Sequence, residues 1–294
     1  MKDKIIRGIT EDKNVRFFAV DSTETVRQAR DIHHLSVTNT VLMGRALSAA
    51  LILALDLKRA DNVLSLKLDG DGACGHLIAT ANNRGEVKAY MRNPQLETPL
   101  NAQTQRLDIK AALGKGTLTL IKDLGLKQPY VGQVELLSGE VAEDLAYYFV
   151  KSEQIPTVVG LGVLVEADGT IRQSGGFMIQ LMPDTPEEVI SKIEQNMAKF
   201  PNLTDVMDMG FDLEEIIRKF ILKDMNPRVT LTSAACYHCN CSKEKFSAAL
   251  DLLERSELIE AMSQGEEIVT ECHFCNQTYA FGSADIKEFL DKKK

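Results

Sequence analysis

The residues best suited to chemistry are the cysteines in the C-terminal part of the chain. Five of the six cysteines in the 294-residue sequence fall in two short clusters, Cys236-Tyr-His-Cys239-Asn-Cys241 and Cys272-His-Phe-Cys275. Four thiolates gathered from two such clusters form the tetrahedral shell that zinc prefers, with Zn–S distances of about 2.3 Å. The spacing therefore predicts a metal site in this region.

Two sets of four ligands are compatible with the spacing. Cys236 with Cys239 and Cys272 with Cys275 form two C-x-x-C pairs, as in structural zinc ribbons. Cys239 with Cys241 forms a tighter C-x-C pair instead. Spacing alone slightly favours the ribbon set and leaves the choice between Cys236 and Cys241 open.

Other roles for clustered cysteines fit less well. Disulfide frameworks belong mainly to small secreted proteins, and the first residues, MKDKIIRGITEDKN, lack the apolar stretch of a signal peptide. We therefore expect a cytoplasmic protein. Buried structural thiols would not need to be clustered in pairs. The sixth cysteine, Cys74, stands apart and is expected to be a small buried hydrophobic residue.

Charge and hydropathy argue against nucleic-acid and membrane partners. The formal net charge is −8 and no long basic run occurs, so an anionic surface is an unfavourable partner. Residues 41–57 are nearly all apolar, but they include Arg45 and Asp56, whose charges are costly in lipid. This run is expected to be a buried core helix, with a dimer interface as the alternative.

Residues 1–183 are typical of a sheet-rich α+β domain with packed helices. Strands are expected at 4–9, 15–20 and 63–69, followed by a meander, and a last hairpin is expected between 157 and 183. The glycines of 70–75 match G-x-G-x-x-G, but strand patterns follow them, so turns are expected instead of a dinucleotide site.

Two helices are expected within this first domain. One begins at Ser22 or Thr23, and another begins at Ser138. The carboxylates Glu140, Glu143 and Asp144 fall in the second helix, where the helix dipole favours negative charge. No nucleophile or histidine stands beside them in a recognisable motif, so we interpret them as the solvated start of a helix.

Residues 184–231 are predicted to be helical. Thr185-Pro-Glu-Glu188 reads as a capping box that opens a helix ending near residue 200, and shorter helices are expected at 204–209 and 212–222. Their many Ile, Met and Phe residues require an apolar support, because such helices are not stable alone in water. The segment is either a permanent helical subdomain or a detachable linker.

Two parts of the sequence resemble a known family. Residues 114–183 (GKGTLTLIKDLGLKQPYVGQVELLSGEVAEDLAYYFVKSEQ, then SGGFMIQLMP) and the tail sequences Cys239-Asn-Cys241-Ser and CHFCNQTYAF closely resemble the redox-regulated heat-shock chaperones of the 33 kDa chaperonin family. Both parts occur in the order found in that family. The resemblance extends over most of the chain and is weaker before residue 40.

The resemblance implies an ATP-independent holdase, a chaperone that holds unfolding client proteins, in the bacterial cytoplasm. One zinc ion would be bound in the reduced, inactive state by Cys239, Cys241, Cys272 and Cys275. Oxidants such as hypochlorite or peroxide would join neighbouring cysteines of this set into disulfides. Zinc would then leave, the small domain and the linker would unfold, and the protein would dimerise and bind clients.

Cys236 is not required by the family pattern. It is expected to be an extra thiol that could replace Cys241 as a ligand, or resolve or divert the disulfides. The resemblance also implies three parts: a core domain at 1–183, a metastable linker at 184–231 and a redox-switch domain at 232–294.

Energetics support such a switch in the 232–294 segment. A segment of this size has a marginal apolar core without a staple. A structural zinc contributes roughly 10 to 16 kcal/mol of apparent binding free energy, which in such a domain is folding free energy. Disulfides between neighbouring cysteines would restrain the unfolded chain by at most about 2 kcal/mol each. Oxidation is therefore expected to melt the domain.

The alternative function is a structural zinc ribbon without redox switching, for which nucleic acid is the usual ligand. Residues 232–294 contain seven Lys and Arg against eleven Asp and Glu, a balance of −4 that offers phosphates little. No P-loop, H-E-x-x-H or nucleophile elbow occurs in the sequence, so an enzyme is not expected. A closed four-thiolate shell also leaves no position for a catalytic water.

Overall fold

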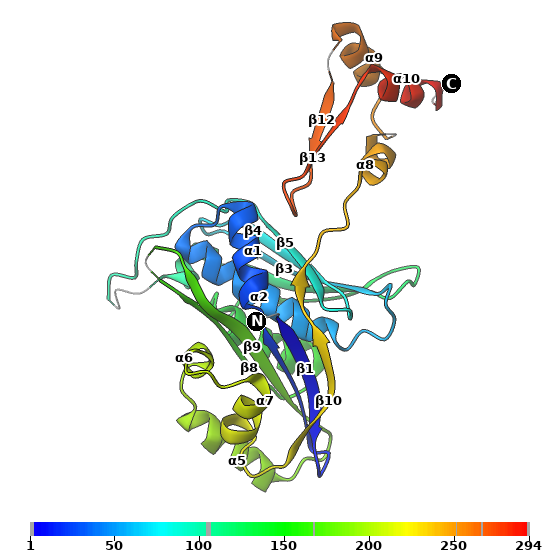
Figure 1. The fold of residues 1–294 in the computed structure, drawn as a ribbon. Coiled ribbons are helices and arrows are strands. Elements are labelled where there is room, and N and C mark those ends of the chain that lie inside the picture. Colours follow the sequence, from blue (N-terminus) through cyan, green and yellow to red (C-terminus); the bar gives the residue numbers. More distant parts are fainter. Residues whose placement is uncertain (1–2, 104–106, 167, 251, 266, 293–294) are drawn as a thin grey trace. The chain divides into compact units, whose positions relative to one another are not determined.

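The structure is a computed structural model that describes residues 3–103, 107–166, 168–250, 252–265 and 267–292. The chain forms two compact units, Met1–His238 and Cys239–Lys294 (Figure 1). Strands and helices alternate irregularly along the larger unit, and the predicted α+β class is confirmed.

The first sheet of the larger unit contains five strands in the order β10-β1-β2-β9-β8. All neighbouring strands in it are antiparallel. The strands predicted at 4–9 and 15–20 and the last predicted hairpin are all present. The bounds are β1 (Lys4–Thr10), β2 (Val15–Asp21), β8 (Thr157–Val165), β9 (Ile171–Leu181) and β10 (Pro227–Ala234).

The second sheet contains six strands in the order β11-β5-β4-β3-β6-β7. Gly70 ends β3, and strand β4 follows the glycine motif, so the predicted turn is confirmed and no helix is available to bind phosphates there. The bounds are β3 (Val63–Gly70), β4 (His76–Ala81), β5 (Glu86–Met91), β6 (Gly116–Asp123), β7 (Tyr130–Glu135) and β11 (Cys236–Tyr237).

Helix α2 (Val37–Ala54) lies in the main core, among residues of both sheets such as Phe18 and Leu66. It begins four residues before the predicted start, because the side chain of Ser36 accepts a hydrogen bond from the Asn39 N–H at 3.3 Å and caps it. Among the described residues α2 is the one helix long and apolar enough to cross a membrane, but most of it is buried in the protein.

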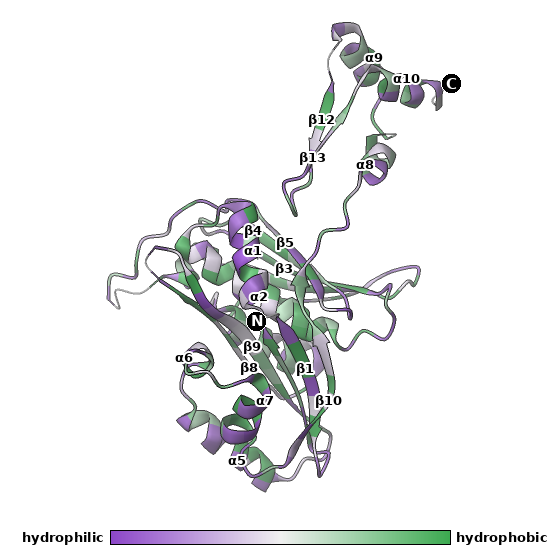
Figure 2. Cartoon of the chain, in the orientation of Figure 1, coloured by the Kyte–Doolittle hydropathy of each residue, from purple (hydrophilic) through white to green (hydrophobic). Residues whose placement is uncertain are grey.

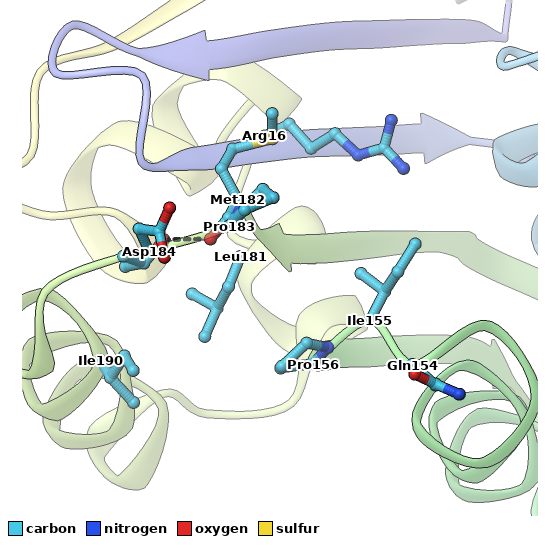
Figure 3. A pocket seen from close by; sticks show the side chains of 10 residues that line it. Arg16, Gln154, Ile155, Pro156, Leu181, Met182, Pro183, Asp184 and Ile190 are labelled. Carbon is cyan, nitrogen blue, oxygen red and sulfur yellow. Dashed lines mark hydrogen bonds between the residues drawn. The ribbon is translucent and has the colours of Figure 1, made fainter.

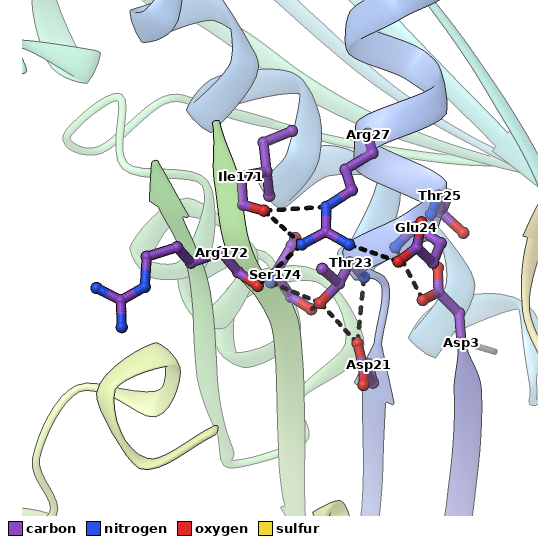
Figure 4. A network of polar contacts seen from close by, with 9 residues as sticks. All are labelled: Asp3, Asp21, Thr23, Glu24, Thr25, Arg27, Ile171, Arg172 and Ser174. Atoms are coloured by element: carbon purple, nitrogen blue, oxygen red, sulfur yellow. Dashed lines mark hydrogen bonds and ion pairs between the residues drawn. The ribbon is translucent and has the colours of Figure 1, made fainter. Parts of the chain in front are cut away.

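Helix α1 (Thr23–His33) is held by polar contacts to the residue before β1 and to the first residue of β9 (Figure 4). The carboxylate of Asp3 accepts hydrogen bonds from the Glu24 and Thr25 N–H groups at 2.9 and 2.6 Å. Arg27 donates from Nε and Nη2 to the Ile171 carbonyl at 2.9 and 2.6 Å. Burial is the main cause of the raised pKa of Asp3.

Helix α4 (Val141–Tyr148) begins differently from the prediction. Asp144 is fully buried and accepts hydrogen bonds from the Leu137 and Ser138 N–H groups at 2.7 and 2.9 Å, while Glu140 pairs with Arg45. The prediction that these carboxylates are solvated is therefore wrong for Asp144. Burial is the main cause of the raised pKa of Asp144. The remaining helical turns of this region are α3 (Ile109–Leu113) and the π-helix η1 (Phe149–Glu153).

Residues 184–226 form a helical layer on the outer face of the first sheet. In β2, Phe17 contacts this layer while Phe18 faces the main core, as side chains alternate along a strand. Figure 2 shows both hydrophilic and hydrophobic residues in these helices. The bounds are α5 (Glu187–Lys199), α6 (Leu203–Asp208), α7 (Leu213–Ile216) and the π-helix η2 (Ile217–Ile221).

The predicted capping box at Thr185 is wrong. No side chain caps α5, because the Thr185 hydroxyl contacts the carbonyl oxygens of Met182 and Asn14 at 2.7 and 2.9 Å. A capping box does form two helices later, where Asp212 and Glu215 exchange side-chain and backbone hydrogen bonds at the start of α7.

The larger unit ends at His238, and the predicted redox-switch domain begins at residue 232. Strand β10 pairs with β1 and strand β11 pairs with β5, so residues up to His238 belong to the larger unit. The helical layer belongs to it as well. The division into core, linker and switch concerns behaviour on oxidation and stays a prediction.

The smaller unit has a two-stranded sheet, helices and a small apolar core. Leu258, Phe281, Ile286 and Phe289 are buried in this core. The bounds are α8 (Lys243–Leu250), α9 (Arg255–Gln264), β12 (Ile268–Glu271), β13 (Thr278–Phe281) and α10 (Ser283–Lys292).

Candidate metal centre

Four cysteines of the smaller unit bring their sulfur atoms together. The Sγ atoms of Cys239, Cys241, Cys272 and Cys275 all lie within 4.8 Å of one another. The Cys239–Cys272 and Cys241–Cys275 distances are 3.7 and 3.3 Å. Tetrahedral zinc with Zn–S bonds of about 2.3 Å separates its sulfur ligands by about 3.8 Å. These four cysteines can therefore hold a metal ion.

A tight turn between β12 and β13 positions two of the sulfurs. The Cys272 N–H donates to the Gln277 carbonyl at 2.9 Å, and the N–H groups of Cys275 and Asn276 both donate to the Cys272 carbonyl. Asn276 adopts a positive φ of 57°, which Asn tolerates better than most residues. This geometry turns the C-x-x-C pair so that both thiols face the same side.

The other two sulfurs come from the C-x-C pair just before α8. The Lys245 ammonium donates to the Asn240 carbonyl at 2.5 Å, and the Lys245 N–H donates to the Ser242 hydroxyl at 3.4 Å, which ties this loop to the start of α8. Cys239 and Cys241 are half-buried. Residues distant in sequence thus contribute one pair of thiols each.

Hydrogen bonding and burial give the thiols different pKa values. Burial acts to raise the pKa of Cys241, but hydrogen bonds from Tyr279 and the neighbouring thiols outweigh it and lower the pKa to about 7. The Tyr279 hydroxyl donates to Cys241 Sγ at 3.1 Å, and the same contact raises the pKa of Tyr279 to about 12. Burial is the main cause of the raised pKa values of Cys239 and Cys275. Cys241 is therefore the thiol that ionises most readily among these three.

Cys236 does not join the group. It lies in β11 of the larger unit, where the residue is exposed; partial desolvation and the nearby carboxylates of Glu86 and Asp3 raise the pKa of its thiol. Spacing slightly favoured a set that includes Cys236, whereas the structure groups the C-x-C pair with the C-x-x-C pair. That these four bind the metal stays a prediction, taken up under the proposed function.

Cys74 has the buried position predicted for it. It is 0% exposed, and its Sγ lies 3.4 Å from the Gly75 carbonyl oxygen. Burial raises its pKa to about 11, so the thiol stays protonated at neutral pH.

An apolar hollow of about 580 Å³ lies where β9 meets the helical layer (Figure 3). Figure 3 shows the side chains of Ile155, Leu181 and Ile190 around it. Asp184, at its rim, has a positive φ of 61°. The lining contains charged surface side chains but no group of residues arranged for catalysis. We therefore interpret the hollow as the junction between the sheet and the first helix of the layer.

Tyr279 is the residue of this site that sequence reasoning did not identify. Its position on β13 gives its hydroxyl access to Cys241, a residue 38 positions earlier in the chain. A tyrosine in an alternating strand pattern carries no local sign of such a contact, so only the fold reveals it.

Comparison with known proteins places the chain in a family. The family model described as Hsp33 protein matches residues 3–282. A protein of Agathobacter rectalis named 33 kDa chaperonin is 44% identical over 288 residues, which cover 98% of this chain and 99% of that protein. The 33 kDa chaperonin of Carboxydothermus hydrogenoformans is 42% identical over 296 residues, with 99% of both proteins covered.

A solved structure agrees with these matches. The crystal structure of the 33 kDa chaperonin of Thermotoga maritima, a heat shock protein 33 homologue, superposes with a TM-score of 0.90 at 36% identity. The match covers 100% of this chain and 99% of that chain. The chain therefore belongs to the Hsp33 family.

Proposed function

We propose that this protein is a redox-regulated, ATP-independent holdase of the cytoplasm and not an enzyme. The observation that carries the proposal is the group of four sulfurs within 4.8 Å of one another, in a chain that belongs to the Hsp33 family. Its partners would be unfolding client proteins and, after oxidation, a second copy of the chain. Nucleic acid and membranes are not expected as partners.

In the reduced state, Cys239, Cys241, Cys272 and Cys275 hold one zinc ion. A zinc ion held there would keep the sulfurs deprotonated, and the four cysteines would then tie the loop before α8 to the β12–β13 turn. The apolar core of the smaller unit is small, with Phe281 and Phe289 as its aromatic members, so this cross-link contributes much of the unit's stability.

Oxidation removes the ligands in pairs. One cysteine sulfur attacks a peroxide oxygen, the O–O bond breaks, and a sulfenic acid and water form. A second cysteine attacks the sulfenic sulfur, and a second water leaves as the S–S bond forms, so one peroxide is reduced for each dithiol oxidised. We propose the pairs Cys239–Cys241 and Cys272–Cys275, as the family resemblance implies. Neither bridge joins the two clusters, so the smaller unit melts.

The helical layer is the proposed client surface. It covers sheet residues that would be costly to expose, including Phe17, Phe177 and Ile179. The layer's own buried residues include Met207 and Met225, whose flexible side chains suit varied partners. When the layer detaches, both surfaces become available to apolar segments of unfolding proteins.

The test measures zinc release and chaperone activity together. Peroxide added to the reduced, zinc-loaded protein should release zinc and, over the same time course, suppress the light scattering of a thermally denaturing client. A variant with Cys74→Ser and Cys236→Ser keeps the four proposed ligands and should behave in the same way. A structural zinc ribbon would keep its zinc, or lose it without gaining activity, and either result would contradict the proposal.

A further inference from the structure

One segment of the larger unit, residues 227–238, covers the edges of both sheets, and we name it the edge strap. Its first part is β10, antiparallel to β1, and its second part is β11, parallel to β5 (Figure 1). Without the strap, β1 and β5 would be the outermost strands of their sheets. An uncovered outer strand presents unpaired N–H and C=O groups that pair with any extended chain.

The strap is held mainly through its backbone. Its pairing with β1 runs from Lys4 opposite Ala234 to Thr10 opposite Pro227. Most side chains of β10 are exposed or half-buried, so they contribute little to this contact. Backbone pairing of this kind does not depend on sequence, and another extended segment could replace the strap.

A single large side chain anchors the strap at its end. Tyr237 is only 6% exposed, and its hydroxyl donates to the Ala89 carbonyl at 3.1 Å and accepts from the Ala89 N–H at 3.3 Å. The same hydroxyl lies 3.0 Å from His33 Nε2. On either side of Tyr237, the N–H groups of Cys236 and His238 donate to carbonyl oxygens of Gly85 and Val87 at 2.9 and 2.8 Å.

Gly85 shows that this sheet edge is shaped for a close approach by the strap. Its φ is +79°, and a Cβ atom added to it would lie 2.0 Å from the Ala234 carbonyl oxygen. Any larger residue would therefore push the strap away from the edge. Gly125 has a similar φ of +71°, but nothing lies within 4 Å of its added Cβ.

We propose that the edge strap occupies a binding site for extended segments of unfolding proteins. The site consists of the outer edges of β1 and β5 and the pocket that holds the Tyr237 ring, so it favours extended segments that carry an aromatic residue. This inference rests on the proposed function and names a surface additional to the helical layer. In the sequence, the strap lies between the helical layer and Cys239. When the layer and the smaller unit both unfold, only the strap's own pairing with β1 and β5 holds it in place.

The test compares Gly85→Ala with Gly125→Ala in the full-length, reduced, zinc-loaded protein. Both substitutions strain a positive φ, but only Gly85→Ala collides with the strap. The probe is a fluorescent synthetic peptide of residues 227–238 that carries Cys236→Ser. In Gly85→Ala, hydrogen exchange in residues 227–238 should rise by about tenfold or more, since local opening becomes easier. The peptide carries the same Ala234 carbonyl and meets the same collision, so it should bind Gly85→Ala only weakly. Tyr237→Ala in the full chain removes the strap's anchor but leaves the site unchanged, so the reduced Tyr237→Ala protein should bind the peptide until a denaturing client displaces it.

The wild-type protein and Gly125→Ala should reject the peptide while reduced, and the oxidised wild-type protein should bind it. A peptide with Tyr237→Ala should bind more weakly than the unaltered sequence. Peptide binding by the oxidised wild-type protein tests the inference even where Gly85→Ala fails to fold.

Two results separate this inference from the proposed function. Oxidised protein that suppresses client aggregation but never binds the peptide would overturn the inference and leave the redox switch standing. A reduced Tyr237→Ala protein that binds peptide and client competitively, in a chain whose wild type ignores peroxide, would support the inference and overturn the switch.

Discussion

The cysteines of this chain occupy three different environments. Four lie close enough to share one metal ion, Cys236 is exposed on a strand of the larger unit, and Cys74 is fully buried. A thiol's environment sets its ionisation and access to oxidants, so the three classes should respond differently to metal, alkylating agents and peroxide.

Metal content distinguishes Cys236 from Cys241. Cys236→Ser should retain about one zinc per chain, because its sulfur lies outside the group of four. Cys241→Ser removes one of the grouped sulfurs and should lower zinc affinity by orders of magnitude. Zinc content of both variants, measured after dialysis against a weak chelator, checks this. Loss of zinc from Cys236→Ser would show that the ribbon set binds the metal.

Alkylation should separate Cys74 from Cys236. With a pKa raised to about 11 by burial, Cys74 at pH 8 is ionised in roughly one molecule in a thousand and is shielded by the core. Iodoacetamide on the reduced, zinc-loaded protein should therefore label Cys236 well before Cys74, as read by mass spectrometry. Equal labelling rates would contradict the buried position.

The Cys74 thiol should also make the stability of the protein depend on pH. The folded-state pKa of Cys74 lies above its ordinary value of 9.0, so the folded state favours the protonated thiol. Its contribution to stability should be complete below pH 9 and lost as the pH rises towards about 11. Cys74→Ala should weaken this alkaline loss in a denaturant titration.

The candidate site could be predicted only in part from the sequence. The pairing of cysteines along the chain indicates a metal centre, because neighbouring ligands are a local property. The choice between Cys236 and Cys241 depends on which strand Cys236 joins, and its partner β5 is distant in sequence. Spacing therefore leaned towards Cys236, and it gave no sign of the Tyr279 hydrogen bond.

At the scale of elements, the helical layer is the part of the fold that the proposed switch would detach. It is a row of short helices whose stability depends on contact with the first sheet. Its last helical stretch is the π-helix η2, a geometry less common than the α-helix and frequent at functional sites. We therefore expect the layer to detach on oxidation while the sheet, supported by α2 on its other face, persists.

Truncating one buried side chain of the layer should weaken it selectively. Ile217 is 1% exposed, so Ile217→Ala should cost about 2–5 kcal/mol. The reduced, zinc-loaded variant should then suppress client aggregation without oxidant, because the layer detaches more often. Met209 is 72% exposed, and Met209→Ala should behave as wild type. An Ile217→Ala protein that stays inactive until oxidised, despite a lowered stability, would contradict this role.

The elements themselves were largely predictable, and their ends were not. β-Branched and aromatic residues around a polar turn predicted β1 and β2, and an alternating pattern predicted β3, because half-buried strands carry a period of two. The start of α5 was misjudged because Thr185 bonds to Asn14, a residue distant in sequence. Asp144 was expected in solvent, since nothing local shows that Leu137 and Ser138 fold back over it.

At the scale of the whole molecule, the order of parts along the chain explains how a small metal centre could control a large surface. The helical layer, the edge strap and the smaller unit follow one another without interruption from residue 184 to the end. The smaller unit has few buried apolar residues, so we expect its folding to depend on a metal held by the four sulfurs. The larger unit has its own extensive core and should survive their oxidation.

Hydrogen exchange of the helical layer, compared between the reduced, zinc-loaded protein and the peroxide-oxidised protein, tests the central claim most directly. We predict that peptides from α5 to η2 lose protection on oxidation, together with the smaller unit, while α2 stays protected. Helical-layer peptides that remain equally protected after the zinc has left would contradict the account.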